Sequence, residues 1–273
     1  MKPPFAYFGG KTILAPKIAA LLPPHQHYVE PFCGGASVLL AKAPSTMETI
    51  NDLDGRLMTF WRVLRDQPED LMRVCALTPH SRGEYQRCLL VDEDPLEDEV
   101  EVARRVWVRI SQGRGGTQRR TGWRNYVKPR GSSIGMPGYL EAYVDRMATV
   151  AARLQHVSLE CRPALELIEQ YGSVERGVVM YVDPPYLRST RSGRNYLVEM
   201  CLPDEHAHLA KLLNDAKATV LLSGYDSPLY DELYEGWYRE TFQATTNGGA
   251  AGNRGVRTEV LWSNRPLTAT AVT

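Results

Sequence analysis

Short apolar runs alternate with helix-like segments along most of this 273-residue chain, and this alternation constrains the fold more than any other feature. The apolar runs are rich in Val, Ile, Leu and Tyr, as strands are, and they lie at 28–31, 47–50, 157–160, 178–182, 219–223, 237–242 and 258–262. Helix-like segments lie between most of them, at about 12–22, 35–43, 54–66, 164–171, 203–215 and 226–234. The pattern predicts an α/β fold with a mostly parallel seven-stranded sheet and helices on both faces. The last two runs have no helix between them, so we expect them to pair antiparallel at an edge.

The stretch 67–153 interrupts this alternation, because its pattern is helical and contains no good strand. We therefore expect residues 1–66 and 154–273 to form the α/β domain, and 67–153 to form an inserted helical subdomain.

Charge is sharply segregated within this insertion. Residues 92–101 hold seven acids and no base, whereas 104–130 hold nine Arg or Lys and no acid. The stretch 111–135 is also rich in Gly and Ser and carries the aromatic residues Trp123 and Tyr126. It is either a solvated loop balanced by the acidic run or a segment that contacts nucleic-acid phosphates and bases. In the second case the contacting cations are Arg114, Arg119, Arg120, Arg124, Lys128 and Arg130.

Composition excludes several classes of protein. Lys plus Arg total 32 and Asp plus Glu total 32, so a wholly basic nucleic-acid coat is disfavoured and a polyanion must be met by a local patch. No apolar run approaches the roughly 18 residues of a membrane span, and the first residues show no secretory signal. The five cysteines form no CxxC pair, which disfavours a disulfide framework and a zinc site. We expect a reduced, cytoplasmic protein with no metal, and a monomer, with a dimer left open.

The strongest motif is Asp183-Pro184-Pro185-Tyr186, which follows the apolar run 178–182 directly. Open α/β sheets place their ligand sites at the carboxyl ends of strands. The two prolines stiffen the loop, so that carbonyl acceptors lie beside a carboxylate and an aromatic ring. This array suits a planar group with an exocyclic amine, which would donate to the Asp183 carboxylate and a proline carbonyl while Tyr186 stacks on the ring. The alternative is an ordinary turn in which Tyr186 merely packs.

Two glycine-containing turns form the second signal. The sequence from Tyr28 through Glu30, Phe32 and Gly34 to Val38 predicts a strand, a turn of small residues and a helix start, where backbone can approach a ligand closely. It lacks the endings of a P-loop and of a full dinucleotide fingerprint. About twenty residues further on, Asp52 is placed to bind ribose hydroxyls, whereas Asp54 is better placed to cap the next helix.

The amino-terminal turn Tyr7-Phe8-Gly9-Gly10-Lys11 brings a fixed cation, Lys11, that is available to a carboxylate. The alternative is that the two glycines only form a loop before the first helix. His206 and His208, two residues apart on an expected helix, do not share a face and are poor joint metal ligands. Arg188, Arg191 and Arg194 follow the Asp-Pro-Pro-Tyr motif, where they either contact phosphates or belong to a solvated loop.

Taken together, these motifs resemble the Dam-type N6-adenine DNA methyltransferases, in the alpha arrangement of that family. The segments YFGGK, EPFCGGASV, NDLD, DPPY, LLSGYD (221–226) and RTEVLWSN (257–264) match it in order, over nearly the whole chain outside roughly 80–155. The resemblance implies a Rossmann-like methyltransferase fold, S-adenosylmethionine as cofactor, double-stranded DNA as partner, and 67–153 as the target-recognition subdomain. It places the cofactor beside Tyr7, Gly9, Gly10, Lys11, Glu30, Phe32, Gly34, Asp52 and Asp183, and the target base at Asp183, Pro184, Pro185 and Tyr186.

The chain departs from the family pattern in two places. Pro163 stands where many members have an acid next to the cofactor adenine, and neither Glu160 nor Glu166 can be assumed to replace it. The loop 113–135 does not look like the recognition segment of members that read GATC, so the target sequence is not inherited.

The implied reaction is direct in-line transfer of a methyl group from the sulfonium of the cofactor to the N6 amine of an adenine flipped out of the duplex. Asp183 and the Pro184 carbonyl would accept the amine hydrogens and stabilise positive charge that develops on the nitrogen. Three alternatives are kept: methylation of cytosine N4 or of RNA adenine, a catalytically inactive DNA-binding protein on the same scaffold, and an NAD-dependent oxidoreductase. The intact Asp-Pro-Pro-Tyr motif argues against the second, and the incomplete glycine fingerprint argues against the third.

Overall fold

The structure is a computed structural model, and it describes residues 1–90, 98–127, 134–187, 200, 202–245 and 256–267. One seven-stranded sheet runs through the α/β part of the molecule, in the order β3-β2-β1-β4-β5-β7-β6. Its strands are β1 (His27–Glu30), β2 (Met47–Asn51), β3 (Ser158–Glu160), β4 (Val178–Val182), β5 (Thr219–Tyr225), β6 (Tyr238–Thr245) and β7 (Val256–Ser263). All seven lie within two residues of the positions expected from the sequence, apart from an extension of β6 by three residues.

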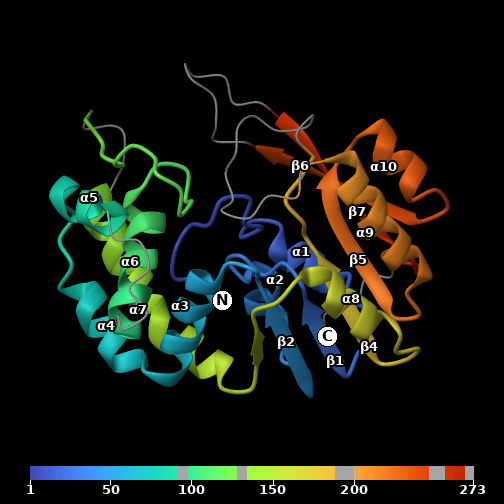
Figure 1. The fold of residues 1–273 in the computed structure, drawn as a ribbon, viewed down its shortest axis with the longest axis horizontal. Coiled ribbons are helices and arrows are strands. Elements are labelled where there is room, and N and C mark those ends of the chain that lie inside the picture. The colour runs from blue at the N-terminus through green and yellow to red at the C-terminus, as the bar shows by residue number, and fades with distance from the viewer. Residues whose placement is uncertain (91–97, 128–133, 188–199, 201, 246–255, 268–273) are drawn as a thin grey trace.

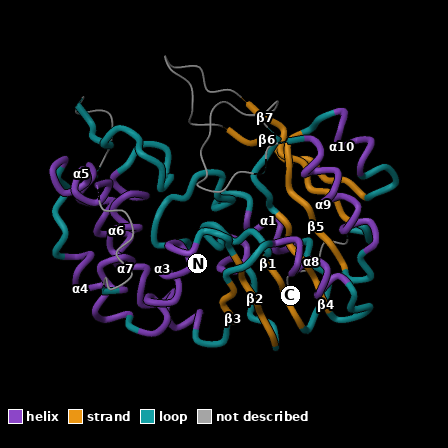
Figure 2. The backbone as a smooth tube through the Cα atoms, in the orientation of Figure 1, coloured by secondary structure: helices purple, strands orange, loops and turns teal. Residues whose placement is uncertain are grey.

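Strand pairing follows the expected pattern. The first five strands are parallel, and the chain reverses direction across the sheet between β1 and β4, which are neighbours. The strand β7 is antiparallel to both β5 and β6, so the last two strands form the expected antiparallel pair with β6 at the edge. Figure 2 shows the strands as one continuous twisted layer.

Both faces of the sheet are buried, and side chains alternate between two apolar cores. Along β4, Val178, Met180 and Val182 enter one core, whereas Val179 and Tyr181 enter the other. The first core lies under α8 (Ala164–Gly172), α9 (Pro203–Asp215) and α10 (Pro228–Leu233), which cover the sheet in Figure 1. The second lies under α1 (Ala15–Ala20) and α2 (Ser37–Ala41). Burial on both faces explains why β4 is a continuous apolar run.

Local backbone geometry shortens two helices relative to their expected lengths. The helix expected over 35–43 begins only at Ser37, because Gly34 (φ 46°) and Ala36 (φ 48°) adopt left-handed conformations that cannot continue a right-handed helix. The helix expected over 12–22 spans only Ala15–Ala20. By contrast, α3 (Gly55–Asp66) begins as expected, with the Asp54 carboxylate accepting hydrogen bonds from Arg56 N (3.1 Å) and Leu57 N (3.2 Å).

The described part of 67–153 consists of four helices with a non-helical loop over 113–127, and it contains no strand. It forms α4 (Pro68–Ala76), α5 (Arg82–Leu90), α6 (Glu99–Gln112) and α7 (Gly135–Leu154). These helices gather on one side of the sheet around α3 (Figure 1), and α3 packs against α4, α6 and α7. Trp61 on α3 and Trp107 on α6 belong to the same core as Tyr28 on β1. The helical group therefore shares a continuous core with the sheet through α3.

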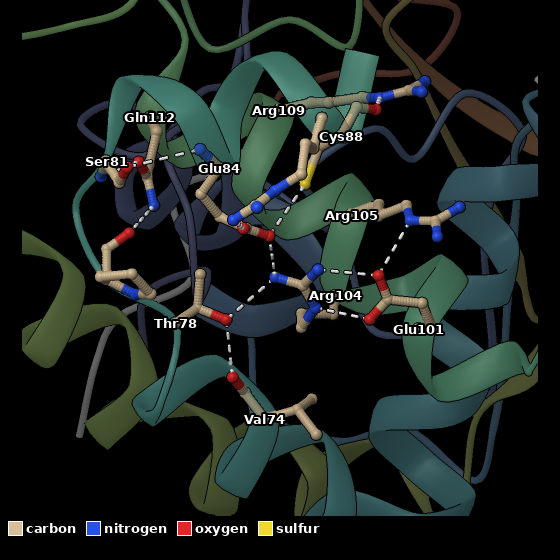
Figure 3. Close-up of polar contacts among 12 residues, drawn as sticks. Val74, Thr78, Ser81, Glu84, Cys88, Glu101, Arg104, Arg105, Arg109 and Gln112 are labelled. Atoms are coloured by element: carbon tan, nitrogen blue, oxygen red, sulfur yellow. Dashed lines mark hydrogen bonds and ion pairs between the residues drawn. The ribbon is translucent and has the colours of Figure 1, made fainter. Parts of the chain in front are cut away.

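Polar contacts within this group use three of the nine basic residues of 104–130, as Figure 3 shows. Arg104 donates to Glu84 (2.8 Å) and to both carboxylate oxygens of Glu101 (2.6 and 2.7 Å), and Arg105 also pairs with Glu101 (2.9 Å). The Arg109 side chain is buried and donates to the Cys88 carbonyl oxygen (2.5 Å). These three cations stabilise the helical core, so the predicted DNA contacts are left to the six cations from Arg114 to Arg130.

Candidate active site

A cavity of about 370 Å³ opens at the carboxyl ends of β1 and β4, the position where ligands bind in open α/β sheets. Its volume lies within the usual range of small-molecule sites. All nine residues predicted to bind a cofactor line it, although they come from four separate segments: Tyr7, Gly9, Gly10, Lys11, Glu30, Phe32, Gly34, Asp52 and Asp183.

The amino-terminal turn and the glycine turn after β1 fit against each other. Gly10 N donates to the Tyr7 carbonyl oxygen (3.0 Å), and a Cβ at Gly10 would lie 2.9 Å from that oxygen. Gly34 lies under the Tyr7 ring, where a Cβ would be 2.7 Å from the ring carbon Cε1. Because Gly34 also has a positive φ, a side chain at this position would strain the backbone and displace Tyr7.

Asp52 holds the glycine turn in place. Its two carboxylate oxygens accept hydrogen bonds from Gly34 N and Asp54 N, each at 3.0 Å. Burial raises the pKa of Asp52 to about 6, and the negative charge of Asp54 adds to this, while the two backbone donors act in the opposite direction. The carboxylate expected to bind ribose therefore also positions the backbone of the neighbouring turn.

Asn51, just before Asp52, belongs to the segment NDLD, but the sequence analysis gave it no role. Its side-chain amide donates to the carbonyl oxygens of Pro31 (2.9 Å) and Arg162 (3.0 Å), and its oxygen accepts from Arg162 N (3.0 Å). The buried amide thus ties together the loops that follow β1, β2 and β3. An Asn placed directly after the apolar run 47–50 is the sequence signal that could have revealed it.

Lys11 and Asp183 form a close ion pair next to the cavity. Lys11 Nζ lies 2.9 Å from each carboxylate oxygen of Asp183, 3.3 Å from Glu259 Oε1 and 3.0 Å from the Gly9 carbonyl oxygen. Burial raises the pKa of Asp183, and the Lys11 ammonium opposes this rise. The carboxylate expected near Lys11 is therefore supplied by the protein itself in this structure.

Tyr186 is buried beside this pair. Its hydroxyl donates to Asp183 Oδ1 (3.1 Å) and to Glu259, while the Lys11 ammonium lies 4.9 Å from its ring centroid. Tyr225 packs edge-on against the same ring at 4.6 Å. Pro185 lines the cavity and Pro184 is buried. The ring face expected to receive a base is thus occupied by protein contacts here, and stacking on Tyr186 stays a prediction.

Glu30 is a second buried carboxyl group in the site. It accepts hydrogen bonds from Tyr28 Oη (3.0 Å) and Leu39 N (3.3 Å). Burial raises the pKa of Glu30 to about 8, against the effect of these two donors. Glu30 is therefore mostly protonated and uncharged at neutral pH.

Several lining residues were not predicted from the sequence: Ser37, Leu53, Ala164, Leu165, Met200, Glu205 and His208. Ser37 Oγ is buried, and no hydrogen-bond partner for it is found among the described residues. Pro163, at the place of the expected acid, lines the cavity next to Ala164 and Leu165, so this wall is apolar. His206 is a core histidine bonded to Tyr230 Oη (2.8 Å) and the Met200 carbonyl oxygen (3.0 Å).

The loop 113–135, called the basic loop from here on, contacts the walls of the cavity at its start. The Gly116 carbonyl oxygen accepts from Phe8 N (2.8 Å), and Gln118 Nε2 donates to the Asp54 carboxylate. A Cβ at Gly116 would lie 2.1 Å from the Ala6 carbonyl oxygen, so the two backbones are in close contact. Figure 1 shows this loop (green) at the end of α6, extending toward the amino-terminal segment.

Some of the predicted DNA-contacting cations lie among the described residues and others do not. Arg114 and Arg120 are exposed, and Arg119 and Arg124 are half-buried. Arg124 donates to Tyr126 Oη (2.8 Å), and its guanidinium carbon lies 5.3 Å from the Tyr139 ring centroid. Lys128, Arg130, Arg188, Arg191 and Arg194 lie outside the described residues.

Within the part of the chain that the structure describes, no helix has the length and hydrophobicity of a membrane span. No cluster of three or more His, Cys, Asp or Glu side chains in that part of the chain could hold a metal ion.

Comparison with known proteins identifies the family. Residues 7–246 match the model of the D12 class N6 adenine-specific DNA methyltransferases, which covers most of the chain. The chain belongs to this family. The resemblance drawn from the Asp-Pro-Pro-Tyr and glycine motifs is thereby confirmed, and the oxidoreductase alternative is excluded.

Named relatives agree with this family. The chain is 28% identical to the type II methyltransferase M1.LlaDCHI of Lactococcus lactis subsp. cremoris, over 97% of this chain and 95% of the relative. It is 23% identical to a DNA adenine methylase of Vibrio cholerae, over 90% of each chain. It is also 25% identical to the DNA N-6-adenine-methyltransferase of Escherichia phage P1, over 94% of this chain but only 34% of that protein.

Proposed function

We propose that this protein transfers a methyl group from S-adenosylmethionine to the N6 amine of an adenine flipped out of double-stranded DNA. The observation that carries the proposal is the placement of Asp183, at the carboxyl end of β4, in the same cavity as the glycine turn and Asp52. A general nucleotide-binding site needs the last two features but does not require a half-buried carboxylate followed by two prolines.

The cavity suits the proposed cofactor by its chemistry. Asp52 offers carboxylate oxygens to ribose hydroxyls, and the apolar wall of Leu53, Pro163 and Leu165 suits a planar adenine. Ser37 Oγ offers a buried polar group to a polar part of the cofactor. When bound, S-adenosylmethionine supplies a methyl group that is activated by its sulfonium centre.

Asp183 and the Pro184 carbonyl supply the acceptors for the target amine. Its nitrogen is a poor nucleophile because its lone pair is delocalised into the ring. Acceptors on both N–H groups favour a more tetrahedral nitrogen and stabilise the positive charge that develops there. The nitrogen returns to neutrality by releasing a proton to solvent. Alignment of the reacting groups can contribute about 7–11 kcal/mol, so positioning is the main task of the protein.

The reaction class is tested by incubating the protein with methyl-labelled S-adenosylmethionine and unmethylated duplex DNA, followed by digestion to nucleosides. We expect the label in N6-methyladenine. Label in N4-methylcytosine, or transfer only to RNA, would support the corresponding alternative. Absence of transfer despite cofactor and DNA binding would support the inactive scaffold.

We expect Asp52→Ala to weaken S-adenosylmethionine binding at least tenfold, or about 1.4 kcal/mol. The substitution removes the predicted ribose acceptor and the two acceptors that hold Gly34 and Asp54. Calorimetric titration measures the effect, with Asp70→Ala, an exposed residue of α4, as the control. Unchanged affinity in Asp52→Ala would exclude this residue from cofactor binding.

We expect the double variant Arg119→Gln, Arg120→Gln to weaken DNA binding and to flatten the slope of log affinity against log salt by up to about two units. These two cations directly follow Gln118, whose side chain contacts the cavity wall at Asp54. The matched control is Arg73→Gln, Arg176→Gln, two exposed arginines outside the loop. An unchanged slope in the loop variant would identify the loop as solvated, and cofactor affinity should be the same in all variants.

A further inference from the structure

Glu259, on β7, has no role in the function proposed so far, although it contacts both Lys11 and Tyr186 beside Asp183. Its side chain is only 5% exposed and lies on the strand that pairs with β5. Glu259 Oε1 is 3.3 Å from Lys11 Nζ and accepts a hydrogen bond from Tyr186. Lys11 is thus held between two carboxylates, those of Asp183 and Glu259.

The number of charges around Lys11 matters for the reaction. Lys11 and Asp183 alone form a neutral pair, in which the ammonium is 2.9 Å from both carboxylate oxygens. A neutral pair stabilises a developing cation poorly, because the ammonium repels the positive charge that the carboxylate attracts. With Glu259 included, one cation faces two anions, and a net negative charge is left beside the target amine.

Other charged groups near Asp183 do not replace Glu259. Glu30 lies at the end of the adjacent strand β1, but burial raises its pKa to about 8, so it is mostly uncharged at neutral pH. Tyr181 and Tyr186, which also surround the carboxylate, have pKa values raised well above their usual range by burial. Among the described groups around this ion pair, Glu259 is therefore the carboxylate available to balance Lys11.

We propose that Glu259 is a positioning residue for methyl transfer: its negative charge balances Lys11, so that the Asp183 carboxylate keeps its charge available to the target amine. The inference rests on the proposed function. Glu259 acts through Lys11, at a separation of 3.3 Å, and does not itself touch the base. To accept the amine N–H, Asp183 gives up part of its contact with the Lys11 ammonium. The negative charge of Glu259 would keep Lys11 paired during this exchange.

The test is a double-mutant cycle between Glu259→Gln and Lys11→Met, which isolates the coupling between the two side chains. The Gln side chain keeps the size and an acceptor oxygen but removes the charge. Single-turnover methyl transfer to unmethylated duplex DNA is measured at saturating cofactor and DNA. We expect Glu259→Gln to slow transfer at least tenfold in the wild-type background and less than threefold in the Lys11→Met background, where no ammonium needs balancing.

Binding, folding and control measurements distinguish this role from a structural one. Dissociation constants for S-adenosylmethionine and DNA should change less than threefold in Glu259→Gln, and its far- and near-ultraviolet circular dichroism should match wild type. Glu240→Gln, an exposed residue on the neighbouring strand β6, should transfer at the wild-type rate.

Three results would overturn the inference. The first is a wild-type rate in Glu259→Gln. The second is equal slowing by this substitution in both backgrounds, which would place its effect on Tyr186 or on packing. The third is a wild-type protein that binds cofactor and DNA but transfers no methyl group to adenine, which would remove the proposed function as well.

Discussion

Replacing Asp183 with Asn is expected to slow methyl transfer by about two to three orders of magnitude, the usual cost of losing one well-placed transition-state partner. The amide has the size of the carboxylate but only one acceptor oxygen, and it carries an NH2 donor. Because Lys11 Nζ contacts both carboxylate oxygens at 2.9 Å, that donor must face either the ammonium or the target amine. The measurement is single-turnover transfer to duplex DNA with cofactor and DNA saturating.

The fold should survive this substitution, because Lys11 keeps a counter-charge in Glu259 at 3.3 Å. DNA affinity should change little, since the basic loop is untouched, whereas some loss of cofactor affinity is expected because Asp183 lines the cavity. An Asp183→Asn rate within threefold of wild type would show that this carboxylate does not accept the amine hydrogen, and the proposed mechanism would fall.

The second large effect concerns Glu30 and the pH dependence of stability. The pKa of Glu30 is about 8 in the folded protein, against a reference value of 4.5. Between these two values the unfolded chain releases the Glu30 proton while the folded protein retains it. This contribution to stability is therefore complete below about pH 4.5, falls as pH rises, and is lost once pH exceeds the folded pKa.

We expect Glu30→Gln to remove this dependence, because Gln stays uncharged and can still accept from Tyr28 Oη. The slope for one group is at most about 1.4 kcal/mol per pH unit, so between pH 5.5 and 7.5 the variant should gain about 2–3 kcal/mol relative to wild type. Urea unfolding at both pH values measures the difference, with the exposed Glu69→Gln as control. Parallel stability curves for wild type and Glu30→Gln would contradict the raised pKa.

The sheet could be predicted from the sequence because its strands are marked locally. Burial on both faces makes β4 a continuous apolar run, and the segments after β1 and β4 carry residues whose chemistry suits a ligand. Parallel pairing of neighbouring strands places their carboxyl ends at the same edge of the sheet. This pairing brings Glu30, at the end of β1, and Asp183, after β4, to one edge, so the residues predicted to bind the cofactor lie together.

The partners of Lys11 could not be predicted in the same way. Asp183 is 172 residues away along the chain, and Glu259 lies in the segment RTEVLWSN, which matches the family in order but indicates no contact with Lys11. Which carboxylates converge on one ammonium depends on the register of β7 against β5, and no local pattern encodes that contact. The helical group shows the same limit, because the charge run 104–130 does not reveal that Arg104 and Arg109 serve the core.

The short contact between the basic loop and the cavity wall has a consequence for exchanging loops between family members. The loop is bonded to the cavity wall as far as Gln118, through the Gly116 contact with Phe8 and the Gln118 contact with Asp54. This first part of the loop is therefore held by the walls of the predicted cofactor cavity. Thr121 and Arg124 are instead anchored to the helical group, because Tyr85 Oη donates to the Thr121 carbonyl oxygen (2.9 Å) and Arg124 N donates to the Gln112 carbonyl oxygen (2.7 Å). A chimaera that seeks a new DNA sequence preference should therefore place its first junction after Gln118, where the graft leaves the shared chemistry of the fold intact.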